Sequence, residues 1–408
     1  MNCRHCGTLI EGNLFVDLDH APPSNAYLSD TDLTKQENYY PLKVMVCDNC
    51  WLVQTQDFNL PDELFTDDYA YFSSTSSTFL THAKNYVEMI TKRLSLDSTS
   101  FVMELASNDG YLLKNFVQNQ IPCLGIEPTK STADESIANN IPTLIEFFGQ
   151  SFASNLMKEH PKADLIIGNN VYAHVPDIND FTSGIQTCLS DEGTVTLEFP
   201  HLANLIKFFQ FDTIYHEHYS YLSLAAVSKI FSHHDLRVYD VERLSTHGGS
   251  LRVYGCHKNS SIQQTPNVEQ LLEYENDLGL LKLETYSNFQ STINDIKYNT
   301  IKFFIDNYKN GLVIDGYGAA AKGNTLLNFA GIKKGLIRRV YDGALAKQNK
   351  FLPGSHIPIV HPKNLMADLP DAIVIFPWNI ADEIVEQHKE LKNSGVKFYS
   401  MIPEIKEL

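Results

Sequence analysis

The segment from Phe211 to Tyr221 holds the densest group of side chains in this sequence that could move protons. Two histidines, one glutamate and three tyrosines fall within the seven residues from Tyr215 to Tyr221. Three interpretations are open from the residues alone: a metal site in which His216 and His218 share one face of a strand, a solvated loop, or acid–base machinery. Removing a proton from a carbon beside a ketone would need the last, with a positioned His or Glu as base and tyrosine hydroxyls stabilising the enolate oxygen.

The cysteines predict a metal site at the N-terminus. Four of the seven form two C-x-x-C pairs separated by roughly 40 residues, namely Cys3, Cys6, Cys47 and Cys50. Four thiolates suit a closed tetrahedral Zn²⁺ site, which leaves no position for water, so we expect structural zinc that holds together a segment with little core. A redox C-x-x-C is the alternative, but such motifs do not come as two matched pairs. The remaining cysteines are expected in the core, at Cys123, Cys188 and Cys256.

Length and composition limit the number of domains and the kinds of partner that we expect. A chain of 408 residues is too long for one hydrophobic core, so we expect two or three domains. A net charge of −17 argues against general affinity for nucleic acid or anionic membrane, although a local basic pocket for one phosphorylated ligand stays open. The sequence has neither a stretch apolar enough to cross a bilayer nor the apolar core of a signal peptide, so we expect no membrane partner and a cytoplasmic location.

The middle of the chain predicts a nucleotide-binding sheet. A buried strand over Phe101–Ala106 breaks at Ser107-Asn108-Asp109-Gly110 and continues as a helix from Tyr111, a unit that presents backbone N–H groups to a nucleotide. A second strand, Cys123–Glu127, ends in an acid that can accept hydrogen bonds from both ribose hydroxyls. The full G-x-G-x-x-G pattern is absent, so a parallel sheet with incidental turns remains an alternative, and the pattern does not separate S-adenosylmethionine (SAM) from a dinucleotide. The polar run 73–77 precedes a predicted helix over 78–94, as a cap or as a ligand contact.

The strands that follow extend this sheet. They are predicted at Ala163–Gly168, Gly193–Phe199, Arg237–Leu244 and Ser250–Cys256. Alternating strands and helices predict an α/β doubly wound sheet with ligands at the carboxyl ends of the strands, where Asn170 and His174 fall. The last two strands form a hairpin, which completes the strand count of a SAM-dependent methyltransferase better than that of a plain dinucleotide fold.

The C-terminal third carries a second nucleotide-like pattern. Residues 264–310 predict a long connecting helix, and Leu312–Ala321 then combines a strand with G-x-G-x-x-A. Asp342 follows a further strand, Arg338–Tyr341, and completes a dinucleotide fingerprint better than the one in the middle of the chain. This motivates a competing hypothesis, an NAD-dependent oxidoreductase acting on a sugar nucleotide. A binding protein with a lapsed site is a third class, disfavoured by the intact Tyr215–His218 cluster.

Several ordered motifs, covering nearly the whole chain, resemble one known family. Besides the two C-x-x-C pairs, they are Asp68–Ser74, Glu104–Gly110, Asn169–Val175, Tyr215–His218, Thr246–Arg252 and Gly318–Thr325. Together they resemble the sugar C-methyltransferases that act on dTDP-linked 4-keto-6-deoxyhexoses. The resemblance implies SAM as cofactor, structural zinc, a nucleotide-sugar substrate, and methylation at C3 through an enolate.

The resemblance also implies a division of the chain. A zinc-binding domain is expected at 1–68, a Rossmann-like class I SAM methyltransferase domain at 69–257, and a second Rossmann-like domain that binds the sugar nucleotide at 258–408. In the middle domain, the resemblance implies that His218 is the base that removes the C3 proton and that Glu217 tunes or assists it. The surrounding hydrogen-bonding shell would be Tyr215, His174 and Tyr69, with Tyr71 close to the last.

Ligand contacts are carried over in the same way. The cofactor contacts expected at the strand ends are Glu104, Ser107, Asn108, Asp109, Gly110, Glu127, Pro128 and Asn170. The substrate contacts expected from the last two domains are Gly249, Arg252, Lys322, Asn324, Trp378 and Asn379. For Lys322 and its neighbours, ordinary loop chemistry is the alternative.

Overall fold

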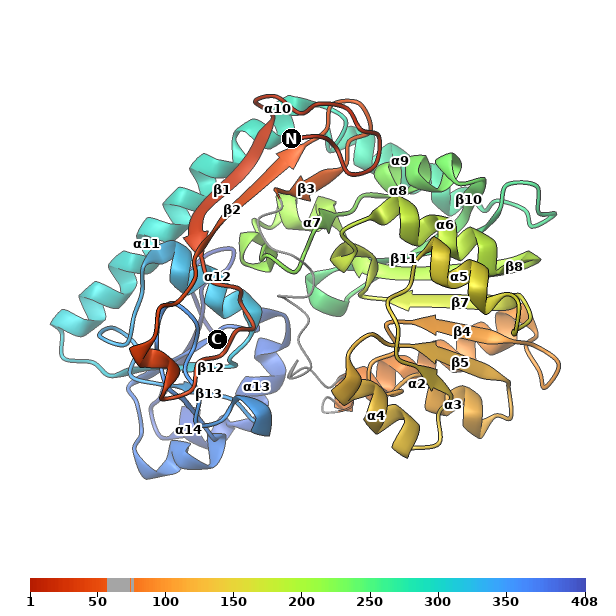
Figure 1. The fold of residues 1–408 in the computed structure, drawn as a ribbon. Helices are drawn as coiled ribbons and strands as arrows, with labels where there is room; N and C mark the ends of the chain where they lie inside the picture. Colours follow the sequence, from red (N-terminus) through yellow and green to blue (C-terminus); the bar gives the residue numbers. More distant parts are fainter. Residues whose placement is uncertain (57–73, 75–76) are drawn as a thin grey trace.

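The fold comes from a computed structural model that describes residues 1–56, 74 and 77–408 (Figure 1). The predicted boundary at 68/69 lies outside the described residues. The first sheet is antiparallel, with order β1-β2-β3-β9, and its strands are β1 (Leu14–Ala21), β2 (Tyr40–Val46), β3 (Val53–Thr55) and β9 (Ser220–Tyr221). The short helix η1 (Asp32–Thr34) lies between β1 and β2. Strand β9 directly follows the Tyr215–His218 cluster, so this sheet ties the cluster to the N-terminal residues.

The central sheet has seven strands in the order β10-β11-β8-β7-β4-β5-β6. They are β4 (Val102–Leu105), β5 (Cys123–Ile126), β6 (Thr143–Leu144), β7 (Ala163–Asn169), β8 (Leu189–Pro200), β10 (Leu236–Leu244) and β11 (Ser250–His257). Numbered in chain order within the sheet, this is 3-2-1-4-5-7-6, whereas a dinucleotide-binding sheet runs 3-2-1-4-5-6. The inserted strand β11 is antiparallel to both neighbours, which gives the class I methyltransferase sheet and confirms that prediction.

Helices pack on both faces of the central sheet. Buried residues of α2 (Ser77–Leu94) and α3 (Leu113–Gln118) share one core with it, and those of α5 (Gln150–Leu156), α6 (Ile178–Cys188) and α8 (Leu224–His233) share another. The same part of the chain also forms α4 (Lys130–Ala138), η3 (Tyr172–His174) and η5 (Thr246–Gly248), whereas buried residues of α7 (Leu202–Lys207) and η4 (Phe211–Thr213) join the core of the C-terminal unit. Helix α6 begins where the Asp177 side chain accepts hydrogen bonds from two backbone N–H groups, and the Ser223 side chain caps α8 by accepting one from Ala226. The three single cysteines are all buried, as predicted.

The predicted long helix over 264–310 is instead three helices: α9 (Pro266–Asp277), α10 (Leu283–Ser287) and α11 (Phe289–Lys309). The break comes at Gly279, whose φ of 78° is left-handed and stops helical propagation. Beyond α11 the chain forms β12 (Ile314–Tyr317), α12 (Ala321–Ala330), β13 (Val340–Tyr341), η6 (Leu345–Lys347), β14 (Ile359–Val360), η7 (Pro362–Ala367), β15 (Ala372–Ile375), η8 (Trp378–Ile380), α13 (Ala381–Gln387), α14 (Lys389–Asn393), β16 (Lys397–Ser400) and β17 (Lys406–Glu407). The sheet order is β14-β13-β12-β15-β16-β17, parallel except for β17, which confirms a second Rossmann-like unit.

The N-terminal residues bridge the two larger units. In Figure 1 the central and C-terminal sheets lie in separate arms, and the β1–β2 hairpin runs along the arm that holds α11. Phe15 of β1 packs against Phe289 of α11 with ring centroids 4.5 Å apart, whereas Cys47 and Leu52 join the core of the central sheet. None of the helices in the described part of the chain is long and apolar enough to cross a membrane.

Candidate active site

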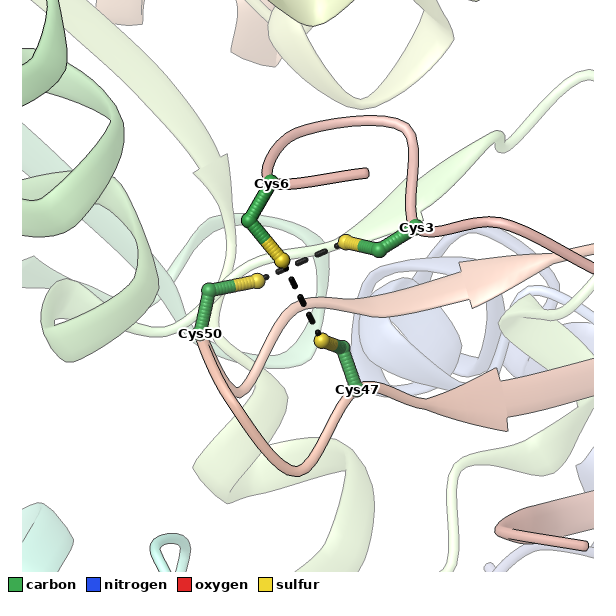
Figure 2. Close-up of side chains that lie close together, drawn as sticks. All are labelled: Cys3, Cys6, Cys47 and Cys50. Atoms are coloured by element: carbon green, nitrogen blue, oxygen red, sulfur yellow. Dashed lines mark hydrogen bonds between the residues drawn. The ribbon is translucent and has the colours of Figure 1, made fainter. Parts of the chain in front are cut away.

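The four paired cysteines converge at the end of the β2–β3 hairpin. Their sulfur atoms all lie within 4.8 Å of one another and point toward a common centre (Figure 2), with 3.4 Å between Cys3 and Cys50 and 3.5 Å between Cys6 and Cys47. A tetrahedral site with Zn–S bonds of about 2.3 Å places its sulfur atoms about 3.8 Å apart, so the donor set fits zinc. Gln54 Nε2 donates to Cys3 Sγ at 3.2 Å and orients that ligand. Elsewhere in residues 1–56 and 77–408, no three or more His, Cys, Asp or Glu side chains are grouped this closely.

The Tyr215–His218 cluster is a buried turn, which overturns two of the three interpretations open from the sequence. The backbone N–H of His218 donates to the Tyr215 carbonyl at 2.9 Å, so the segment is not a strand. The His216 ring bonds the Tyr40 carbonyl, while the His218 ring bonds the Thr213 carbonyl, so the two imidazoles diverge and do not form a shared metal site. Both rings and Glu217 are buried, which excludes a solvated loop.

His218 has the geometry of a proton acceptor. Its Nδ1 lies 2.8 Å from the Thr213 carbonyl oxygen, which can only accept, so Nδ1 carries the hydrogen and Nε2 keeps a lone pair. The ring packs against Tyr215 with centroids 3.9 Å apart and meets His174 edge-on at 4.6 Å. Burial, helped by the neighbouring His174, holds the pKa of His218 well below its ordinary value, so the imidazole is neutral at neutral pH.

Of the residues predicted to surround His218, the structure places Tyr215 and His174 against its ring. Burial lowers the pKa of His174 to about 4, although a hydrogen bond to the Glu217 backbone acts in the opposite direction. The Glu217 side chain accepts a hydrogen bond from Asn25 Nδ2 at 3.1 Å, and burial raises its pKa. Tyr69 and Tyr71 lie outside the described residues.

The predicted cofactor loop has three residues with a left-handed backbone, and only one of them is glycine. Ala106, Asn108 and Gly110 have φ values of 55°, 51° and 74°, so alanine and asparagine stand where the usual pattern has glycine. The Asn108 N–H donates to one oxygen of Glu127 at 2.8 Å, and Thr129 N–H donates to the other at 2.9 Å. This fixes the Glu127 carboxylate beside the loop while each oxygen retains a further lone pair.

Buried acceptors surround this loop. Glu104, Asp109 and Glu127 are all buried, and burial together with the two neighbouring acids raises the pKa of Glu104 well above its ordinary value. Among the residues that the structure describes, neither Glu104 Oε2 nor Asp109 Oδ1 has a hydrogen-bond partner. A ligand with ribose hydroxyls, an ammonium and a sulfonium charge would supply what these acids lack, so the residues fit SAM.

The other expected cofactor contacts, Ser107, Pro128 and Asn170, differ in burial and in backbone contacts. Ser107 is buried against Gly125, whose added Cβ would lie 2.4 Å from Ser107 Oγ. Pro128 is half-buried next to Glu127. The Asn170 N–H donates to the Glu198 carbonyl at 2.7 Å, with a left-handed φ of 55° at the end of β7.

Three of the expected substrate contacts meet beside the cluster. Lys322 Nζ donates to Asn379 Oδ1 at 2.8 Å and lies 4.2 Å from the Trp378 ring centroid. Trp378 Nε1 donates to Asp212 Oδ2 at 2.7 Å, which joins this group to the segment that carries His218. Burial lowers the pKa of Lys322 to about 8 and raises that of Asp212 to about 6. Sequence reasoning did not single out Asp212, although it stands three residues before Tyr215.

The other three expected substrate contacts are engaged within the protein. Arg252 is 3% exposed and bonds Glu198 at 2.9 Å and Glu242 at 3.1 Å. Asn324 Nδ2 donates to the Ser24 carbonyl at 2.6 Å, and a Cβ added at Gly249 would meet Asn204. Among the residues that the structure describes, Arg252 Nε and Asn324 Oδ1 nevertheless have no hydrogen-bond partner, so their assignment to the substrate stays a prediction.

His247 was not assigned from sequence, although it lies in the Thr-His-Gly-Gly motif. Its φ of 54° is left-handed, its ring lies 5.2 Å from that of Phe79, and burial lowers its pKa to about 4. The adjacent Gly248 touches Trp378, because a Cβ there would lie 2.2 Å from the indole. The turn 246–249 therefore joins the central unit to the Lys322–Trp378–Asn379 group.

The C-terminal G-x-G-x-x-A loop is used for internal contacts. Asp342 accepts hydrogen bonds from the N–H groups of Ala319 and Ala344, both at 2.8 Å. The Ala319 carbonyl accepts from Tyr27 Oη at 2.6 Å and Lys347 Nζ at 2.9 Å. These contacts tie the loop to Asp342, Tyr27 and Lys347, while each Asp342 oxygen retains a further lone pair, as the Glu127 oxygens do.

Comparison with known proteins agrees with this geometry. Three family models match successive parts of the chain: "Putative zinc binding domain" at residues 3–65, "Methyltransferase domain" at 79–241 and "C-methyltransferase C-terminal domain" at 245–403. C-methyltransferase NovU from Streptomyces niveus is 32% identical over 402 residues, which is 98% of this chain and 95% of the relative. The chain belongs to the C-methyltransferase family. The zinc-binding N-terminal domain and the methyltransferase domain predicted from sequence are thereby confirmed in this C-methyltransferase.

Solved structures match parts of the C-methyltransferase at low similarity. Magnesium protoporphyrin IX methyltransferase from Synechocystis PCC 6803, with bound SAH, is 13% identical with a TM-score of 0.35, covering 44% of this chain and 82% of that one. The PH0226 protein from Pyrococcus horikoshii OT3 is 12% identical with a TM-score of 0.39, covering 50% of this chain and 100% of that one.

Proposed function

We propose that this C-methyltransferase transfers a methyl group from SAM to C3 of a dTDP-linked 4-keto-6-deoxyhexose. The observation that carries the proposal is the buried His218, whose Nδ1–H is held by the Thr213 carbonyl while Nε2 keeps its lone pair. Methylation at carbon requires such a group, because a C–H beside a ketone must first lose its proton to a base.

The proposed steps assign each role to a residue. The C4 ketone acidifies the C3–H bond, and His218 Nε2 removes that proton, leaving the electron pair on the enolate. Bound SAM supplies an electrophilic methyl group, so that the C3–CH₃ bond forms as the S–CH₃ bond breaks. Tyr215 and His174 pack against the His218 ring and would hydrogen-bond the developing oxyanion. Burial disfavours imidazolium, so His218 releases the proton to water after turnover.

Lys322 supports the assignment of a phosphorylated substrate. Asn379 and Trp378 hold its ammonium beside Asp212, in a chain whose net charge is −17. A fixed cation in an otherwise acidic protein can serve as a binding group for a diphosphate. We assign Lys322, Asn379 and Trp378 to the nucleotide diphosphate, and Glu104, Asp109 and Glu127 to SAM.

The test is a product analysis. The purified protein, incubated with SAM and a dTDP-linked 4-keto-6-deoxyglucose, should give a nucleotide sugar heavier by one methyl group, with the new carbon attached to C3 by NMR. Methylation at an oxygen would overturn the enolate step. An NADH absorbance change with the same sugar nucleotide, and no methylated product, would favour the oxidoreductase instead.

A further inference from the structure

Each C-x-x-C pair forms a turn that we call a zinc knuckle, the first at Cys3–Cys6 and the second at Cys47–Cys50. Arg4 stands in the first knuckle, and its side chain extends away from the cysteines. Its Nη1 donates to the Pro176 carbonyl at 2.6 Å, and its Nη2 donates to the Thr55 carbonyl at 3.0 Å. The guanidinium also lies over the ring of Tyr219, 5.3 Å from its centroid. One side chain therefore contacts three separate segments of the chain.

Two of those segments carry the histidine pair. Pro176 lies two residues after His174, and Tyr219 immediately follows His218. Tyr219 N–H donates to the Ala173 carbonyl at 2.8 Å, so the two segments are hydrogen-bonded where Arg4 reaches them. The imidazoles that they present lie 4.6 Å apart and nearly perpendicular.

The third segment, at Thr55, provides a second link between Arg4 and His218. Thr55 accepts from Arg4 through its carbonyl and donates through Oγ1 to the His218 carbonyl at 3.1 Å. Strand β3, which ends at Thr55, pairs with β9 just after His218. Arg4 thus acts on the backbone of His218 both through Tyr219 and through Thr55.

The zinc knuckle fixes Arg4 in turn. The Arg4 N–H donates to Gln54 Oε1 at 2.9 Å, and Gln54 Nε2 donates to Cys3 Sγ at 3.2 Å. Gln54 is fully buried, so its amide has one orientation that satisfies both bonds. A planar guanidinium can make two bonds from one fixed fork, which an ammonium at the same place cannot.

We infer that Arg4 is a positioning residue that couples the zinc knuckle to the His174–His218 pair. This inference rests on the proposed function for the role of His218. It extends the sequence-based expectation, in which zinc only held the N-terminal domain together. Displacing a reacting group by about 1 Å costs on the order of 100-fold in rate, so loss of Arg4 should act on turnover.

The test compares Arg4→Lys and Arg4→Gln with Lys229→Gln. Lys229 Nζ donates to the Asn49 carbonyl at 2.8 Å, so the control removes a similar contact to the second knuckle without reaching either histidine segment. For each protein we would measure bound zinc by elemental analysis, SAM affinity by calorimetry, and kcat and KM with dTDP-4-keto-6-deoxyglucose. Both Arg4 variants should keep zinc and SAM affinity and lose roughly 10- to 100-fold in kcat with little change in KM. Lys229→Gln should match the parent protein.

A second measurement is independent of turnover. In protein with ¹³C-labelled histidine and bound S-adenosylhomocysteine, the His218 ring signals should shift and titrate nearer the ordinary pKa in Arg4→Gln, because the loosened ring gains water. Unchanged His218 signals, a parent-like kcat, or a kcat loss that merely follows zinc loss would each overturn the inference. If the parent protein failed to methylate the sugar while the signals still moved, the proposed function would fall and the coupling would stand.

Discussion

The Nδ1 of His218 lies 2.8 Å from the carbonyl oxygen of Thr213, and that hydrogen bond decides which nitrogen of the ring is left to react. A carbonyl cannot donate, so the proton belongs to Nδ1 and the lone pair to Nε2. The partner is a backbone atom five residues upstream, held by a short helix that ends at Thr213. The tautomer of the proposed base is therefore set by a backbone carbonyl and not by another side chain.

Replacing His218 should separate binding from chemistry. His218→Asn removes the acceptor lone pair from a positioned base, a contribution typically worth 100- to 10,000-fold, so kcat should fall by at least 100-fold while SAM affinity stays within about threefold. The matched control is His216→Asn, since its imidazole faces the Tyr40 carbonyl instead. Steady-state kinetics and calorimetry check both quantities. Parent-like turnover in His218→Asn would remove this residue from the mechanism.

The pH dependence of kcat/KM should reflect the lowered pKa values of the buried His218 and Lys322 side chains. Only neutral His218 accepts a proton, and its pKa is held well below 6.5, so the rate should stay level as pH falls to 6.5 and decline only under more acidic conditions. On the alkaline side, Lys322 loses its charge near its pKa of about 8, so kcat/KM should fall above that pH as diphosphate binding weakens. Lys322→Gln should abolish the alkaline decline and raise KM. An acid limb centred at 6.5 or above would contradict the buried base.

Loss of zinc should lower the stability of the fold. Cys50→Ser removes one of four thiolates, and the knuckle packs directly against the core of the central sheet. We expect loss of bound zinc and a lower first unfolding transition, by about 5–10 °C for a loss of roughly 3 kcal/mol. Cys123→Ala, which changes a buried cysteine outside the site, should retain full zinc. Elemental analysis and calorimetric scanning distinguish the two variants.

Gly248 should control the substrate end of the site. Its φ is 85°, and an added Cβ would lie 2.2 Å from the Trp378 indole, so Gly248→Ala must displace the ring that Lys322 rests on. We expect KM for the sugar nucleotide to rise about tenfold, equivalent to about 1.4 kcal/mol, with SAM affinity unchanged. Gly343→Ala, where nothing lies within 4 Å of the added atom, is the control. An unchanged KM would place the substrate elsewhere.

Local sequence patterns predict much of the fold but few of the contacts in the candidate site. The break between Phe101–Ala106 and Tyr111, and the paired cysteines, are visible in sequence because their chemistry is local. Arg252 shows what is not visible: its partner Glu198 lies 54 residues away, so the sequence could not indicate that this arginine forms a buried ion pair. The cofactor loop was ambiguous for another reason, since Ala106 adopts a left-handed φ that predicts glycine. Gly279 likewise ends a helix that its neighbours would continue.

Strand β1 packs on α11, which lies far along the chain from it, and this has a consequence for synthesis. Asp17 N–H bonds Gln290, 273 residues further along the chain. At roughly 5–20 residues per second, a ribosome needs about 15–50 s to make that interval. During this time the β1–β2 hairpin has left the ribosome without its partner. The face of β1 that meets α11 thus stays uncovered for that interval, and a chain released before Gln290 would lack this contact.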